Sequence, residues 1–152
     1  MPDSGPGDAD RSAPAERESH RPIAVLIVDD EPLIRWALAE TLKDLHCQVV
    51  EAADARSALD ALTKEPTRFD VIVLDYRLPD AHDLTLMATV RQLSPHSRVI
   101  LLSAFLPPEV TARALALGAW RLLRKPHDLN AIAALVMELR NVPRTAQSDI
   151  TS

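Results

Sequence analysis

The chain has 152 residues, the length of a single domain, and 47% of them are hydrophobic, so most of it should fold around a core. Its formal net charge of −5 argues against a non-specific nucleic-acid binder, which needs a basic face. Cys47 is the single cysteine and no apolar run has the length of a membrane span, which argues against a disulfide framework, a cysteine-based metal site and a spanning helix. We therefore expect a cytoplasmic protein without direct contact to nucleic acid or membrane.

The composition divides the chain into a domain and two tails. Residues 1–21 are rich in Pro, Asp, Ser, Gly, Arg and Glu, and they carry almost no large apolar side chains. Such a segment buries too little surface to offset the entropy of ordering, so we expect a disordered tail. Residues 141–152 are also polar and should form a flexible C-terminal tail. The domain is expected to span residues 22–140.

Strand and helix patterns alternate along this domain. Short aliphatic runs predict buried strands at Ile23–Val28, Cys47–Ala52, Val71–Asp75, Arg98–Leu102 and Trp120–Arg124. Apolar residues at helical spacing predict a helix after each strand, with start signals at Pro32, Asp54, Asp83, Pro107-Pro108 and Asp128. The fourth helix is expected to end at Gly118.

The helical spacing also predicts which residues face the core. In the first helix these are Leu33, Ile34, Ala37, Leu38, Thr41, Leu42 and Leu45. In the third they are Leu84, Met87, Ala88 and Leu93, and in the last they are Ile132, Leu135, Val136 and Leu139.

Five strands alternating with five helices predict right-handed βαβ crossovers and a parallel sheet covered on both faces. For this length we expect a flavodoxin-like (βα)5 three-layer sandwich with strand order 2-1-3-4-5. In that order the first and third strands are neighbours, and their carboxyl ends form the switch point at which such sheets bind ligands.

Polar residues follow the strands at this edge. Asp29 and Asp30 end the first strand, Asp75 the third, Ser103 the fourth and Lys125 the fifth. Taken alone, Asp75 is as consistent with a turn cap as with a reactive carboxylate, since Asp is a common turn residue. The expected convergence of the other four residues favours the reactive carboxylate.

The chemistry of this edge suits the acceptance of a phosphoryl group. Three carboxylates and one ammonium leave a negative site, and hard oxygen ligands of this kind suit Mg²⁺, with Mn²⁺ as the alternative ion. An aspartate can act as a nucleophile and form an aspartyl phosphate, a reaction that demands charge neutralisation and positioning. The metal and Lys125 would neutralise the phosphoryl oxygens, and Ser103 would donate its hydroxyl to one of them.

Four segments resemble the receiver domains of two-component response regulators, of the single-domain chemotaxis type. They are VLIVDDEP (25–32), VIVLDYRLPD (71–80), VILLSAF (99–105) and the Lys125-Pro126 pair after Gly118-Ala119. Each is weak alone, but together, in this order and at family spacing, they are a specific match that covers residues 23 to about 140.

The resemblance implies a role for each residue at the sheet edge. Asp75 would be the phosphoacceptor and would also contact the metal, which Asp30 would bind directly and Asp29 through water. The main-chain carbonyl of Arg77 would be a further metal ligand. Ser103 would be the switch hydroxyl and Lys125 the phosphate-binding lysine. The resemblance also implies a cis peptide bond between Lys125 and Pro126, which is rare outside X-Pro bonds.

The family further implies a phosphoacceptor signalling domain, which is no enzyme beyond metal-dependent self-phosphorylation and autodephosphorylation. The donor would be a histidine kinase or a histidine phosphotransfer protein. Because the sequence shows no output domain after Arg140, we expect a stand-alone regulator that signals to a downstream protein by contact or by onward phosphotransfer, unless the sequence is a fragment of a longer regulator. A homodimer through the fourth helix, the fifth strand and the fifth helix is a further option.

Two positions depart from the family pattern, and two more bear on the lifetime of the phosphoryl group. Asp83 stands where a glycine usually starts the third helix, so this loop should be shaped differently. Leu122 stands where the fifth strand usually carries the Tyr or Phe of the switch, which puts the aromatic half of the switch in doubt. Arg77 and Phe105 are bulky and flank the path of an attacking water, so we expect slow spontaneous loss of the phosphoryl group.

Other functions fit the sequence less well. Leu122 slightly favours a receiver-like scaffold that binds partners without phosphorylation, but the acidic residues, Ser103 and Lys125 weigh against it. A flavodoxin needs a phosphate loop where this chain is acidic, and a haloacid-dehalogenase-like phosphatase carries its nucleophile after the first strand. The helix face with Arg35 and Trp36 fits a docking surface for a kinase or phosphotransfer protein and a partly exposed packing tryptophan equally well.

Overall fold

The computed structural model describes residues 21–125 and 129–141. The predicted tails, except Arg21 and Asn141, therefore lie outside the described residues, as do the predicted helix cap Asp128 and the peptide bond to Pro126. Strands and helices alternate along the described residues, and a short 3₁₀ helix follows the last α-helix. The elements are β1 (Ala24–Val28), α2 (Pro32–Asp44), β2 (Gln48–Ala52), α3 (Ala55–Lys64), β3 (Val71–Asp75), α4 (Thr85–Leu93), β4 (Arg98–Ser103), α5 (Pro108–Ala116), β5 (Ala119–Arg124), α6 (Leu129–Glu138) and the 3₁₀ helix Leu139–Asn141.

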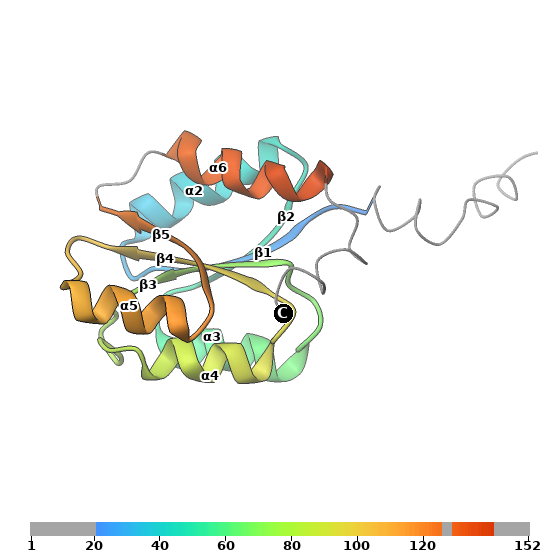
Figure 1. Cartoon of the computed structure of the whole chain (residues 1–152). Coiled ribbons are helices and arrows are strands. Elements are labelled where there is room, and N and C mark those ends of the chain that lie inside the picture. Colours follow the sequence, from blue (N-terminus) through green and yellow to red (C-terminus); the bar gives the residue numbers. More distant parts are fainter. Residues whose placement is uncertain (1–20, 126–128, 142–152) are drawn as a thin grey trace, which may run out of the picture.

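The five strands form one parallel sheet in the order β2-β1-β3-β4-β5, which confirms the predicted flavodoxin-like fold (Figure 1). The register sets which strand ends meet. Val28 pairs with Leu74, so the residues that follow β1 lie beside the end of β3. Ser103 pairs with Arg124, which brings the end of β4 beside Lys125. The carboxyl ends of four strands therefore reach one edge of the sheet.

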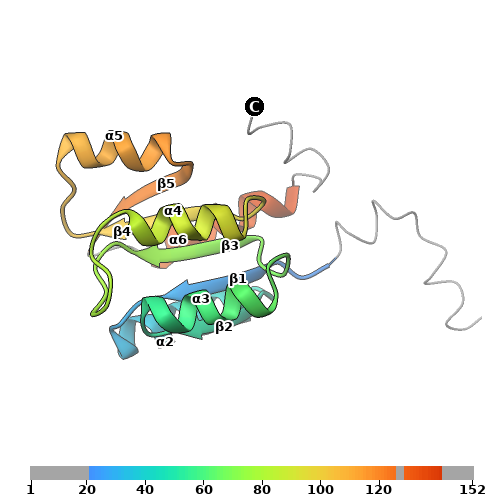
Figure 2. The same cartoon turned by 90° about the horizontal axis from the view of Figure 1, so that it is seen from below.

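Helices cover both faces of the sheet. α2 and α6 lie on one face, and α3, α4 and α5 lie on the other, as the two views at right angles show (Figures 1 and 2). The side chains of β1 and β3 alternate between the two cores, so that both strands are fully buried. This burial on both faces explains why their sequences are continuous aliphatic runs.

The turn from α5 to β5 needs a glycine. Gly118 has a φ of +104°, a conformation that side chains rarely adopt. A Cβ atom there would also lie 2.8 Å from Nε of Arg91. That guanidinium is fixed, because its Nη1 donates hydrogen bonds to the carbonyls of Pro95 and Ser97. The predicted helix end is therefore close to correct, although the helix itself stops at Ala116.

Two local predictions were wrong. Helix α4 begins at Thr85 and not at Asp83, because the Asp83 carboxylate accepts the Thr85 N–H at 2.9 Å in a turn that precedes the helix. Leu33 was expected to face the core, but it is 75% exposed. Because α2 begins just beyond the end of β1, its first turn has little sheet beneath it, and its buried residues start at Leu38.

None of the helices in the described part of the chain is long and apolar enough to cross a bilayer.

Candidate functional site

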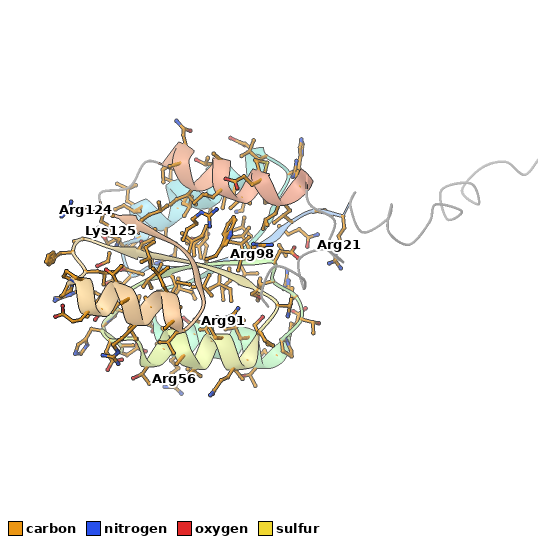
Figure 3. The ribbon with its side chains drawn as sticks, in the orientation of Figure 1. Arg21, Arg56, Arg91, Arg98, Arg124 and Lys125 are labelled. Carbon is orange, nitrogen blue, oxygen red and sulfur yellow. The ribbon has the colours of Figure 1, made fainter. Side chains whose placement is uncertain are left out.

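A cavity of about 420 Å³ lies at the carboxyl edge of the sheet. Figure 3 places Lys125 and Arg124 at this end of the molecule and Arg21 at the opposite end. Asp29 is buried beside the cavity, at 2% exposure. The structure thus brings together all the residues predicted to meet there. The cavity is lined by Asp30, Glu31, Asp75, Arg77, Ser103, Ala104, Phe105 and Lys125.

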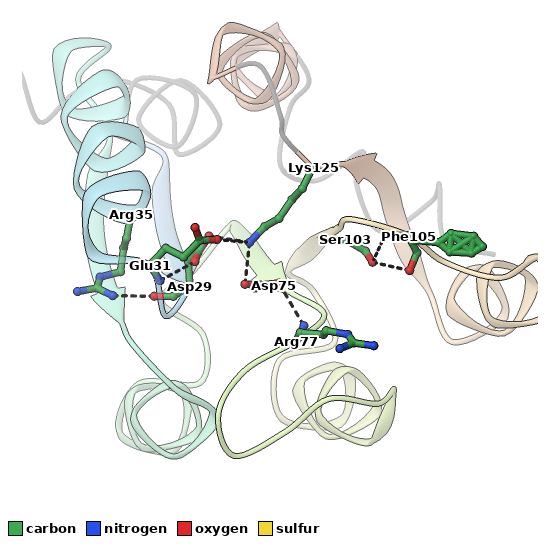
Figure 4. A network of polar contacts seen from close by, with 8 residues as sticks. All are labelled: Asp29, Glu31, Arg35, Asp75, Arg77, Ser103, Phe105 and Lys125. Atoms are coloured by element: carbon green, nitrogen blue, oxygen red, sulfur yellow. Dashed lines mark hydrogen bonds and ion pairs between the residues drawn. The ribbon is translucent and has the colours of Figure 1, made fainter.

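Lys125 is the electrostatic centre of this site (Figure 4). Its Nζ donates hydrogen bonds to Oδ2 of Asp75 at 2.8 Å and to Oε1 of Glu31 at 3.1 Å. Oδ2 of Asp29 lies 3.5 Å from the same nitrogen. The main-chain N–H of Lys125 donates to the Ser103 carbonyl at 2.7 Å, which ties the lysine to the end of β4. One ammonium is therefore shared among three carboxylates, two of which follow β1 and one of which ends β3.

Burial and hydrogen bonding shift the pKa values of Asp75 and Lys125 away from their ordinary values. Burial raises the pKa of Asp75, and the hydrogen bonds from Lys125 and from the Arg77 N–H offset this only in part. For Lys125, burial alone would lower the pKa, but hydrogen bonds to Asp75 and Glu31 outweigh it, so its pKa lies above the ordinary value. The lysine is therefore firmly charged at neutral pH, while the Asp75 carboxylate is kept in an environment that disfavours its charge.

The main-chain N–H groups of Asp29 and Glu31 hold the acidic segment after β1 in place. Asp29 donates its N–H to the Ala52 carbonyl at 3.1 Å, and its Oδ1 accepts the Glu31 N–H at 2.9 Å. The carboxylates of Asp29, Asp30, Glu31 and Asp75 offer oxygens that all lie within 4.8 Å of one another. An all-oxygen donor set of this size fits the preference of Mg²⁺ for hard ligands.

Glu31 was missed as a member of this cluster. Sequence reasoning did not single it out, although it directly follows Asp29 and Asp30. Its contact with Lys125 joins residues 94 positions apart and depends on the fold, so the sequence offered only its adjacency to the two aspartates as a signal.

The loop after Asp75 is short and tied down. The Arg77 N–H donates to Oδ1 of Asp75 at 3.1 Å, while the Arg77 side chain is exposed. Leu78 and Ala81 then exchange two main-chain hydrogen bonds. Asp80, which the sequence did not single out, accepts the N–H groups of Ala55 and Arg56 and so joins this loop to the start of α3. Leu78 and Asp80 belong to the motif VIVLDYRLPD, and Ala81 directly follows it.

Ser103 lines the cavity, and Leu122 lies beside it at a second cavity that Ser103 also lines. The Ser103 hydroxyl donates to the Phe105 carbonyl at 3.0 Å and accepts the Phe105 N–H at 3.2 Å (Figure 4). It is therefore engaged with the loop after β4 and not with Asp75. Leu122 is half-buried and lines a second cavity of about 240 Å³, together with Phe105, Leu106 and Thr111.

Comparison with known proteins decides the family. A family model described as the response regulator receiver domain matches residues 25–137, which is most of the chain. The chain belongs to the response regulator receiver domain family. Receiver domains are phosphorylated on an aspartate in two-component signal transduction, and they are phosphoacceptors rather than conventional enzymes. They bind Mg²⁺ at an acidic pocket, and this receiver domain has such a cluster of carboxylates.

Individual relatives agree with this assignment. The receiver domain is 37% identical over 119 residues to the response regulator protein PilR of Pseudomonas aeruginosa, covering 76% of this chain and 26% of PilR. It is 32% identical over 108 residues to sporulation initiation phosphotransferase F of Bacillus subtilis, covering 71% of this chain and 86% of that protein. Against the Fimbriae Z protein of Salmonella typhimurium it covers 53% of the relative, so the chain spans about a quarter to a half of the first curated relatives that it matches.

Solved structures show the same fold. The chemotaxis response regulator CheY4 of Vibrio cholerae superposes with a TM-score of 0.69 at 30% identity, covering 78% of this chain and 98% of that one. A CheY-like receiver domain protein of Methanospirillum hungatei reaches a TM-score of 0.75 at 23% identity, covering 85% of this chain and 98% of its own, which supports the fold alone.

Proposed function

We propose that this receiver domain accepts a phosphoryl group on Asp75. The observation that carries the proposal is the setting of this carboxylate. It ends a central strand, it is 4% exposed but borders the cavity, and it contacts the one lysine of the site. Of the clustered carboxylates, Asp75 is the one that combines burial, a cavity in front of it and a direct hydrogen bond from Lys125.

The proposed reaction is an in-line transfer. One oxygen of Asp75 attacks phosphorus, a bond from that oxygen to phosphorus forms, and the bond from phosphorus to the donor breaks. When the donor is a phosphohistidine, its imidazole nitrogen is the leaving group and recovers its electron pair. Because the nucleophile is already an anion, no general base is needed.

The remaining residues would position and neutralise the group. Asp29, Asp30, Asp75 and the main-chain carbonyl of Arg77 would hold Mg²⁺ or Mn²⁺, which when bound supplies positive charge beside the phosphoryl oxygens. The ammonium of Lys125, now shared by Asp75 and its neighbours, would transfer its contact to a phosphoryl oxygen. The Ser103 hydroxyl would leave Phe105 and donate to another oxygen. These roles are proposals that the geometry supports.

We also propose a place for the domain in signalling. A histidine kinase or a histidine phosphotransfer protein would donate the phosphoryl group. The output would be contact with a downstream protein or onward phosphotransfer, as a stand-alone regulator. The good coverage of a relative named as a phosphotransferase supports the second of these outputs.

Intact-mass spectrometry after incubation with acetyl phosphate and Mg²⁺ tests the proposal. We expect one phosphoryl group on the wild-type protein and none on Asp75→Asn or in the presence of a chelator. Asp60→Asn is the matched control, because it removes an exposed aspartate of α3 that, among the described residues, forms an ion pair with Lys64 alone. An adduct that persists in Asp75→Asn would contradict the proposal, and no adduct on the wild type would favour a scaffold that acts without phosphorylation.

A further inference from the structure

Arg35 links the acidic segment to the edge of the sheet. It lies in the first turn of α2, and 18% of its side chain is exposed. Its Nη1 donates a hydrogen bond to the main-chain carbonyl of Asp29 at 2.6 Å (Figure 4). Its Nε donates to Oε1 of Glu51, on the edge strand β2, at 3.1 Å. The planar guanidinium therefore has one arm on the acidic segment and one on a fixed strand.

The Asp29 carbonyl, which accepts the hydrogen bond from Arg35, lies between two of the clustered carboxylates. It belongs to the peptide unit that joins Asp29 to Asp30, and a peptide unit is planar. Its orientation therefore sets the backbone from which both carboxylates project. Asp29 has further restraints at its N–H and its carboxylate, but none of the described residues donates a hydrogen bond to the Asp30 carboxylate. The direction of Asp30 thus depends on how firmly this peptide is held.

We propose that Arg35, oriented by Glu51, is a positioning residue of the acidic site. By fixing the peptide between Asp29 and Asp30, it presents both carboxylates to a divalent cation. The inference rests on the proposed function, because it assumes that this cluster holds the metal. It assigns Arg35 no contact with the metal or with the phosphoryl group.

Positioning and simple electrostatics predict opposite results, which makes the inference testable. Arg35 brings a positive charge near a cation site, so on charge alone its removal should tighten Mg²⁺ binding. If Arg35 acts by holding the peptide, its removal should weaken binding, as loss of outer-shell partners typically does by about 10-fold. A lysine would keep the charge but lose the planar, two-armed geometry of the guanidinium.

The experiment is a calorimetric titration of the protein with MgCl₂, without any phosphoryl donor. We expect binding to weaken by about 10-fold in Arg35→Gln and to weaken also in Arg35→Lys. Lys43→Gln is the control, because it removes a positive charge from the last turn of the same helix, where Lys43 pairs with Glu40. Thermal unfolding checks that each variant is folded. If Arg35→Gln does not fold, Mg²⁺ binding by Arg35→Lys tests the inference.

Amide hydrogen exchange of the metal-free protein is the second readout. We expect faster exchange at Glu31, whose N–H donates to the Asp29 carboxylate, in both Arg35 variants and unchanged exchange in Lys43→Gln. Unchanged or tighter Mg²⁺ binding in the Arg35 variants, or unchanged exchange at the Glu31 amide, would overturn the inference and leave the proposed function intact. If the wild-type protein itself bound no Mg²⁺, the metal site of the proposed function would fail and this inference with it.

Discussion

Asp75 carries a buried negative charge beside other carboxylates, and this has a cost in stability. Burial is the main reason that the pKa of Asp75 is raised, and Asp29 adds to it. An asparagine has nearly the same shape without the charge. We therefore predict that, in a chelator at about pH 7, Asp75→Asn is more stable than the wild type by about 1 kcal/mol, the usual size of a single-residue effect. Chemical denaturation of both proteins measures the difference.

The pH dependence of that difference identifies its cause. A raised pKa means that the folded protein binds this proton more tightly than the unfolded chain does. The cost is therefore full above the raised pKa and disappears as the pH falls through the ordinary aspartate range, near about pH 4. We expect the stability advantage of Asp75→Asn over the wild type to shrink as the pH falls from the raised pKa of Asp75 towards about pH 4. If the stability difference stayed constant over this pH range, packing and not the charge of Asp75 would be its cause.

Arg77 and Phe105 are predicted to protect a phosphoryl group on Asp75. Both line the cavity in front of this carboxylate, and both side chains are exposed. We expect Arg77→Ala and Phe105→Ala each to shorten the lifetime of the phosphorylated protein several-fold, because water gains access. The measurement is release of phosphate after the donor is removed. A half-life of seconds in the wild type would refute the protective role.

At the scale of single elements, the turn into β5 depends on Gly118. Alanine there would be strained by the φ of +104° and would collide with the guanidinium of Arg91, which is held by two carbonyls. We predict that Gly118→Ala lowers the free energy of unfolding by about 1–3 kcal/mol, as such backbone strain does. Thermal unfolding tests this, with Ala116→Ser at the exposed end of α5 as the control. An unchanged unfolding midpoint would mean that the turn relaxes without cost.

The loop after β3 and the start of α3 are predicted to be coupled through Asp80. Its two carboxylate oxygens accept the N–H groups of Ala55 and Arg56 at 2.8 and 3.1 Å, beside the capping box that Asp54 forms with Ser57. Asp80→Ala should leave the first two amides without partners and cost about 1 kcal/mol, the usual value for a lost helix cap. Hydrogen exchange should rise at Ala55 and Arg56, and protection equal to the wild type at these amides would contradict the coupling.

Local patterns in the sequence were sufficient to predict most elements, and the failures have physical causes. The central strands are buried on both faces, and their continuous aliphatic runs therefore predicted them correctly. Asp83 is a good helix cap by composition, but its carboxylate closes a turn one residue too early for that role. Leu33 keeps helical spacing with core residues, yet spacing gives the face of a helix and not where along its length the sheet ends.

At the scale of the whole molecule, the site exists because a parallel sheet brings the ends of distant strands together. The strand order could be predicted from the alternation of strands and helices, and it placed Asp29, Asp75, Ser103 and Lys125 at one edge. The contacts of Glu31 and Arg35 could not be predicted in this way. They depend on side-chain directions across elements, such as the reach of Lys125 to Glu31 and of Arg35 to Glu51.

The central claim is that Asp75, among several clustered carboxylates, carries the phosphoryl group. Borohydride tests it directly, because hydride reduces an acyl phosphate, phosphate leaves, and the aspartate becomes homoserine. After treatment with acetyl phosphate and Mg²⁺ followed by borohydride, peptide mapping by mass spectrometry should find homoserine at position 75 and aspartate at positions 29 and 30. Homoserine at position 29 or 30, with unchanged aspartate at position 75, would contradict the account.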